Sequence, residues 1–223
     1  MGYSVKDNIL PHVKALLVRD METNAIGSLG DLETLSTDSL IENNLTIAAV
    51  TIARIAPLDM FSSLTQKTYT EDDVTTIEAS KYNKRGGWCV ADDMCRIISV
   101  RANGWAKALH DVDSASNVLY DIARDPLNGT LGTVGSPYVC ISYDNEERLE
   151  YYPKIDAVEE EVCLYVNGIP YPAIVNGEID IEAKLYEAVC LYIAYLVAME
   201  KKMSNAETYK IEAMTNIGVN INN

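Results

Sequence analysis

The fold of this chain is decided by its C-terminal residues 180–218, which read DIEAKLYEAVCLYIAYLVAMEKKMSNAETYKIEAMTNIG. Apolar side chains recur there at three- and four-residue spacing from Ile181 to Met203, which is the periodicity of a helix. Residues 188–199 are twelve consecutive apolar or aromatic residues, fewer than the roughly 20 that a membrane-spanning helix needs. The stretch therefore predicts a helix buried on all sides, with Asp180 as its N-cap.

A second helix is predicted directly after this run. Ser204 and Glu207 have the spacing of a capping box, and Gly218 is the residue type that most often ends a helix at the C′ position. The two helices should form a hairpin. A hairpin this apolar needs partners, either from elsewhere in the chain or from another subunit.

The best candidate partner within the chain is the segment 36–56. It opens with several possible N-caps, Ser36-Thr37-Asp38-Ser39, and Pro57 should end it. A shorter helix is expected over residues 8–18, followed by a polar loop over 19–33. The core predicted for the resulting bundle consists of Leu40, Ile52, Leu185, Val189, Tyr192, Leu196 and Met199.

The middle of the chain, from about Tyr69 to Val175, favours strands and turns. Residues 96–101 are β-rich and precede Asn103-Gly104, the dipeptide most typical of tight hairpins. A second hairpin is predicted over 138–152 and a third around Asn167-Gly168.

This order of elements predicts an α+β fold. The N- and C-terminal helices, residues 1–66 and 176–223, are expected to form one helical bundle. Residues 67–175 are expected to form a β-rich, sandwich-like module inserted between them.

Composition narrows the possible functions. The chain is 48% hydrophobic and 23% charged, which is ordinary for a globular protein, but its net charge is −15. This charge argues against a general nucleic-acid binder and against an anionic membrane surface. The five cysteines lie among apolar residues without a Cys-x-x-Cys pair, which predicts reduced, buried thiols of an intracellular protein and no zinc site.

Motifs of catalysis are missing from the sequence: it contains no Gly-x-Ser-x-Gly elbow, phosphate-binding loop or dinucleotide signature. If the protein is an enzyme after all, the sequence leaves one alternative, a small metal-dependent enzyme with a site built from Asp92, Asp93, His110 and Asp111. A polar loop is the favoured interpretation of these residues. We therefore expect neither enzymatic activity nor a cofactor.

Charge is divided between two segments. Residues 81–107 carry six basic and two acidic residues, a net of +4, and residues 144–161 carry eight acidic and two basic residues, a net of −6. Complementary patches suit head-to-tail self-association, although two solvated faces are the simpler interpretation. The candidate subunit-interface residues are Lys81, Lys84, Arg85, Arg96, Arg101, Glu146, Glu147, Glu159 and Glu160.

Three parts of the sequence together resemble a known family. They are a helix that ends in Ala56-Pro57, a β segment from Asp93 to Val100 that leads to Gly104-Trp105, and Leu149-Glu150-Tyr151-Tyr152 followed by the terminal hairpin. Their order is similar to that of head-to-tail connectors of tailed bacteriophages: the adaptor, or ring, proteins of short-tailed, crAss-like phages, of the tail tubular protein A type.

The resemblance implies a structural virion protein that assembles into a homo-oligomeric ring, commonly of twelve copies, at the portal–tail junction. The portal would lie above it and tail or nozzle proteins below. Genomic DNA would pass through the lumen without sequence-specific binding, and no membrane or catalytic residue would be involved. The alternative within the same class is another tail-completion or capsid-associated protein.

Overall fold

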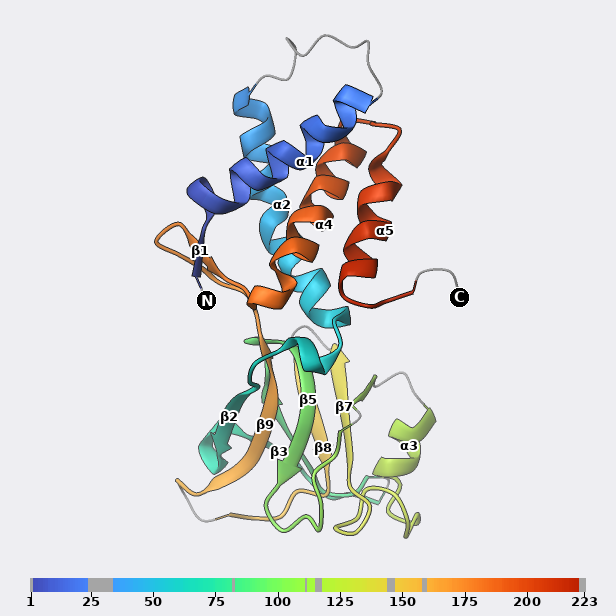
Figure 1. The fold of residues 1–223 in the computed structure, drawn as a ribbon. Helices are drawn as coiled ribbons and strands as arrows, with labels where there is room; N and C mark the ends of the chain where they lie inside the picture. The colour runs from blue at the N-terminus through green and yellow to red at the C-terminus, as the bar shows by residue number, and fades with distance from the viewer. Residues whose placement is uncertain are drawn as a thin grey trace. The chain divides into compact units, whose positions relative to one another are not determined.

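The computed structural model describes residues 2–23, 34–81, 83–110, 112–114, 118–143, 147–157 and 160–220. It confirms the predicted α+β fold: N- and C-terminal helices pack together, and the strands of the β-sheets come between them in the sequence (Figure 1). The chain divides into two compact units, residues 1–63 with 171–223, and residues 64–170. The boundaries predicted from the sequence lie between residues 66 and 67 and between residues 175 and 176, a few residues later in each case. We call the first the helical unit and the second the β unit.

Among its described residues, the helical unit contains four α-helices, α1 (Leu10–Thr23), α2 (Thr34–Ile55), α4 (Tyr186–Glu200) and α5 (Ala206–Asn216). Helix α4 contacts α1, α2 and α5, so the predicted hairpin does find its partners within the chain. Helix α1 follows a π-helical segment, Val5–Ile9, and continues through Thr23, beyond the predicted start of the loop at Arg19. Helix α2 begins before its predicted caps, and it ends before Pro57 as expected.

The start of each hairpin helix differs from prediction. Asp180 lies in a strand, and α4 begins at Tyr186 after a 3₁₀ turn, so Asp180 is not an N-cap. Asn205 is the N-cap of α5 and makes no side-chain cap bond, so the predicted capping box does not form. In both cases the preceding backbone conformation, which spacing alone does not reveal, places the cap elsewhere.

The end of α5 is as predicted. Gly218 has a φ of 73°, in the left-handed region that glycine adopts without steric cost. Its N–H donates to the Thr215 carbonyl over 3.0 Å, and the Val219 N–H donates to the Met214 carbonyl over 2.9 Å. These two bonds are a Schellman motif, and they satisfy carbonyls that the helix end would leave without partners.

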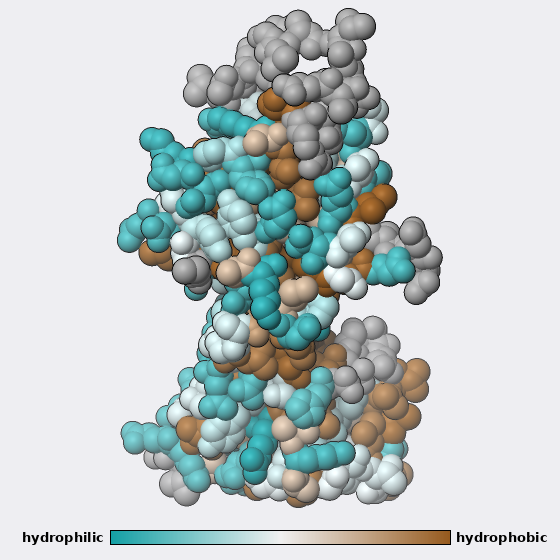
Figure 2. Space-filling model, in the orientation of Figure 1, coloured by the Kyte–Doolittle hydropathy of each residue, from teal (hydrophilic) through white to brown (hydrophobic). Residues whose placement is uncertain are grey.

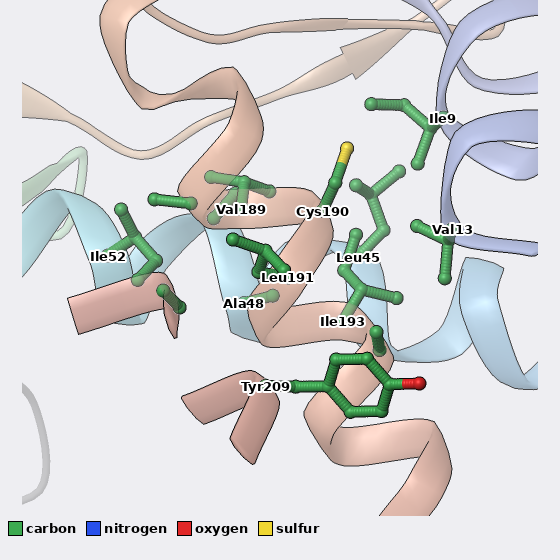
Figure 3. Close-up of a cluster of buried hydrophobic side chains, with 14 of the residues drawn as sticks. Ile9, Val13, Leu45, Ala48, Ile52, Val189, Cys190, Leu191, Ile193 and Tyr209 are labelled. Atoms are coloured by element: carbon green, nitrogen blue, oxygen red, sulfur yellow. The ribbon is translucent and has the colours of Figure 1, made fainter. Parts of the chain in front are cut away.

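The core of the helical unit surrounds α4 (Figure 3). Of the predicted core residues, Ile52, Leu185 and Val189 are buried, whereas Leu40, Tyr192 and Leu196 are half-buried. Met199 is 50% exposed, so its assignment to the core is wrong. Residues 192, 195, 196 and 199 share one stripe of α4 that is only partly covered: the first three are half-buried at the edge of the core, and Met199 is exposed.

A small antiparallel sheet, absent from the prediction, completes the helical unit. Its strand order is β1 (Gly2–Ser4), β11 (Glu178–Asp180), β10 (Ile174–Val175). Strands β10 and β11 are joined by Asn176 and Gly177, which both have positive φ, as a type I′ hairpin turn requires.

The β unit is a sandwich of two sheets. One has the order β2 (Thr65–Thr70), β9 (Val162–Pro170), β5 (Met94–Ala102); we call it the three-stranded sheet. The other has the order β3 (Thr75–Ile77), β4 (Gly86–Val90), β8 (Glu147–Tyr152), β7 (Tyr138–Tyr143), β6 (Asp113–Ser114). Neighbouring strands are antiparallel except β6 and β7. One core lies between the sheets, with Val100 and Leu164 from the first and Val139 and Leu149 from the second.

Only one of the three predicted hairpins of the β unit forms as expected, the pair β7–β8. Asn103-Gly104 does make a turn, but the chain beyond it joins β5 only through one bridge, between Val100 and Leu109. Asn167-Gly168 lies inside the continuous strand β9, so that hairpin is wrong. A Cβ on Gly168 would lie 2.6 Å from the Arg96 carbonyl oxygen, which shows that this glycine serves a close approach between strands and not a turn.

Candidate interaction surfaces

The two oppositely charged segments meet within the chain. Arg85 Nη1 lies 2.6 Å from Asp156 Oδ2, which joins the basic segment 81–107 to the acidic segment 144–161. The hydrogen bond from the Arg85 guanidinium holds the pKa of the Asp156 carboxyl below its ordinary value. Part of the charge that the sequence offered for contacts between subunits is therefore used inside one subunit.

Lys154 extends this network into the interior. Its side chain is fully buried, and its ammonium pairs with the Glu71 carboxylate and lies 3.9 Å from Asp156 Oδ1. The Lys154 N–H donates to the Arg85 carbonyl over 3.1 Å. A buried charge is tolerated only where a partner of opposite charge compensates it. Lys154 therefore holds parts of the β unit together and is not an exposed interface residue.

Six of the remaining predicted interface residues are described, and they differ in exposure and in the element that carries them. Lys81, Arg101 and Glu160 are exposed; Lys84 is half-buried and donates to the Leu131 carbonyl; Arg96 is half-buried on β5. Glu147 begins β8, and Glu146 and Glu159 lie outside the described residues. Of the described basic residues in this set, Arg101 is exposed and lies on a strand, β5.

A short helix that sequence reasoning missed covers the outer face of the five-stranded sheet. Helix α3 spans Val118–Arg124 and buries Ala123 against Tyr138, Cys140 and Tyr152 of that sheet. Its anchor is polar, because the Tyr120 hydroxyl donates to Glu150 on β8 over 2.9 Å. Burial and this hydrogen bond raise the pKa of Tyr120, so the phenol stays protonated and remains a donor.

Glu150 gathers further donors around this anchor. The Ser142 hydroxyl donates to it over 2.8 Å and the Tyr152 hydroxyl over 3.3 Å. The carboxylate thus ties α3, β7 and β8 together under the helix. With one face held in this way, the orientation of α3 on the sheet is fixed.

The other face of α3 is apolar and exposed (Figure 2). Val118 is 72% exposed and Leu119 and Ile122 are 43% and 36% exposed, while Leu127, just after the helix, is 91% exposed. Monomeric proteins rarely leave such a group of large apolar side chains in water. We call these four residues the α3 face. The three- and four-residue spacing of Val118, Leu119 and Ile122 is the signal that could have revealed it.

A second surface lies on the outer face of the three-stranded sheet. Thr68, Tyr165 and Arg101 stand opposite one another on β2, β9 and β5, and all three are exposed. Their chain neighbours Tyr69, Leu164, Val166, Val100 and Ala102 belong to the sandwich core, so this row points outward. We call it the cationic row.

Other features of the described residues give less support for a functional site. An open hollow of about 500 Å³ in the helical unit is lined by residues including Leu10, Asp38 and Glu42. Within the described ranges, no three His, Cys, Asp or Glu side chains are placed to share a metal ion. Two residues of the alternative metal site that the sequence suggested can be located or excluded. Asp93 Oδ2 forms an ion pair with Lys67 Nζ over 2.8 Å, and Asp111 lies outside the described residues. In the same part of the chain, no helix has both the length and the apolarity to cross a membrane.

The prediction of buried, reduced thiols is confirmed: all five cysteines are buried, and none of them forms a disulfide. Comparison with known proteins adds no family assignment. No model of a known protein family matches the chain, and a search of curated proteins gives no significant match.

Proposed function

We propose that this protein is a ring-forming head-to-tail connector of a short-tailed, crAss-like bacteriophage. The observation that supports this most is the discontinuous architecture, in which helices from both ends of the chain form one unit and a β-sandwich is inserted between them. That is the arrangement that the sequence resemblance implies for such connectors. The exposed apolar α3 face, which is unusual for a monomer, adds to it.

The mechanism of such a protein is physical. Each subunit contacts the next through two different surfaces, and the ring closes when the rotation between neighbours completes a circle. The portal would contact one rim of the ring and the tail or nozzle proteins the other. With a net charge of −15 per subunit, the ring would repel the phosphate backbone of DNA, so the genome could slide through the lumen without adhering.

The test is the assembly state of the purified protein. We expect ring-shaped particles by negative-stain microscopy and a closed oligomer by mass photometry, with the protein alone or mixed with its portal. Protein that remains monomeric even with the portal would contradict the proposal. Particles of another symmetry would favour a different tail-completion or capsid-associated protein.

A further inference from the structure

We propose that the α3 face of one subunit binds the cationic row of the next copy of this chain. This inference rests on the proposed function and specifies the contact that would build the ring. The occupant of each surface is then a second copy, and the two surfaces are the two halves of one heterologous interface.

The α3 face supplies the apolar half. Leu119 and Ile122 are exposed on a helix whose opposite face is fixed by Ala123 and the Tyr120–Glu150 bond, and the exposed Leu127 follows just after that helix. A rigid apolar surface loses little conformational entropy when it is covered, so its burial is converted efficiently into affinity. It therefore has the properties of the apolar centre of an interface.

The cationic row supplies the complementary half. Tyr165 and Arg101 are the residue types most enriched where interfaces concentrate their binding energy, and they lie in register on neighbouring strands. The exposed Thr68 flanks Tyr165 on the other side. The aliphatic and aromatic surfaces of these side chains can cover apolar groups, while their polar ends remain at the rim.

Charge determines which pairing is favoured. Two exposed acids, Asp121 on α3 and Asp125 just after it, border the α3 face, whereas the nearby bases are half-buried: Arg124 lies over the Tyr120 ring and Lys84 donates to the Leu131 carbonyl. Arg101 gives the row the opposite sign, so α3 against the row is attractive, whereas α3 against another α3 would place acids together. The two surfaces lie on different sides of the sandwich, separated by its core, as a contact repeated around a ring requires.

The first experiment uses two variants that each break one half. Leu119→Gln with Leu127→Gln alters the α3 face, and Tyr165→Thr with Arg101→Glu alters the row. Each variant alone should need at least about tenfold more protein to assemble than the wild type. Mixed in equal amounts, the two variants retain one intact interface per pair and should form a heterodimer that does not grow. Ile211→Gln, which changes an exposed apolar residue of α5, is the matched control and should assemble normally.

A second experiment detects the contact directly. Because all five native cysteines are buried, a surface cysteine can be cross-linked selectively. A Leu127→Cys protein mixed with a Thr68→Cys protein should give mixed dimers with a bismaleimide reagent, and neither protein alone should give dimers. Cross-links within one variant only would overturn the inference.

The outcomes separate this inference from the proposed function. If the wild type forms rings and both face variants also form them unchanged, the contact is wrong and the connector proposal stands. If both variants lose assembly but their mixture gives no heterodimer, the pairing of these two faces is wrong. If the wild type stays monomeric with and without the portal, both proposals fail together.

Discussion

The side-chain amide of Asn44 on α2 donates to Glu200 Oε1 at the end of α4, over 2.7 Å. The same amide donates to the Leu40 carbonyl over 2.9 Å, and Asn44 is buried between the helices. Apolar contacts alone would let α4 slide or rotate along α2 at small cost. The bond to Glu200 fixes their register, because another alignment would leave one N–H of this buried amide without its acceptor, while the bond to Leu40 stays within α2.

Asn44→Ala should therefore lower the free energy of unfolding of the helical unit by about 1–2 kcal/mol. Far-UV circular dichroism in a urea titration would measure this, since it reports mainly on helices. Thr46→Ala, at an exposed position of the same helix, is the control and should change the stability by less than about 0.5 kcal/mol. Equal effects of the two variants would show that Asn44 does not fix the helix pair.

Glu71→Gln tests the buried Lys154. It removes the carboxylate that neutralises a fully buried ammonium, and only Asp156, 3.9 Å away, remains close. We expect a loss of about 3 kcal/mol from the stability of the β unit. The two tryptophans, Trp88 and Trp105, both lie in that unit, so their fluorescence in denaturant is the appropriate measurement.

Lys154→Met should cost less than Glu71→Gln, because it removes the buried charge and leaves Glu71, which is partly exposed, to water. Glu160→Gln, an exposed acid of the same segment, is the control and should be nearly neutral. A larger loss for Lys154→Met than for Glu71→Gln would contradict a purely electrostatic role.

The Asn-Gly pairs show how far the sequence could predict this fold. Local chemistry favours a tight turn at each of the four Asn-Gly pairs, Asn103-Gly104, Asn128-Gly129, Asn167-Gly168 and Asn176-Gly177. Only the last joins two strands through a two-residue turn, whereas Asn167-Gly168 lies inside β9, where β5 approaches too closely for a side chain at Gly168. Helix periodicity was predictive because it reflects burial directly, and it located both hairpin helices and α2.

The candidate site was less predictable for a related reason. Net charge along the sequence marked Arg85 and the segment around Asp156 as opposite surfaces, but folding pairs them within one chain. The α3 face was overlooked because its helix is only seven residues long, so its apolar spacing is too brief to stand out from a loop. Which charges remain exposed is decided by tertiary contacts, and a single sequence does not contain them explicitly.

Gly168→Ala should destabilise the β unit by about 1–3 kcal/mol. Its Cβ would lie 2.6 Å from the Arg96 carbonyl oxygen and 3.2 Å from Met94 Sδ, so β5 and β9 would have to separate. Gly135→Ala is the matched control: nothing lies within 4 Å of its Cβ, and it should be neutral or slightly stabilising. Tryptophan fluorescence in denaturant compares the two, and similar stabilities would mean that the close approach of the strands is not required.

The five thiols should be unreactive in the folded protein. Burial raises the pKa of Cys89 and of Cys190 to about 12, so almost no thiolate, the reactive form, is present at neutral pH. A disulfide reagent such as DTNB should release essentially no signal from the native protein at pH 8 and five equivalents after denaturation. Rapid reaction of any native thiol would show that its part of the core opens readily.

Asp73 should make the β unit sensitive to acid. Its Oδ2 accepts the Thr70 N–H and the Thr70 hydroxyl, each over 2.8 Å, and these bonds hold the pKa of the Asp73 carboxyl below its ordinary value of 3.8. Because the folded-state pKa is the lower one, the ionised carboxylate contributes its full stabilisation above the unfolded value. That contribution is lost as the pH falls below about 4 and through the folded-state pKa. Asp73→Asn should therefore be less stable than the wild type at pH 7, and the difference should shrink steadily towards pH 2.

Asp72→Asn is the charge-matched control for this prediction, since it removes the neighbouring exposed carboxylate. Free energies of unfolding from tryptophan fluorescence across the pH range would give both differences. The decisive quantity is how the loss for Asp73→Asn depends on pH, because general charge repulsion would affect both variants alike. If the two pH profiles are parallel, the Thr70 bonds do not stabilise the ionised form of Asp73, and the acid sensitivity has another origin.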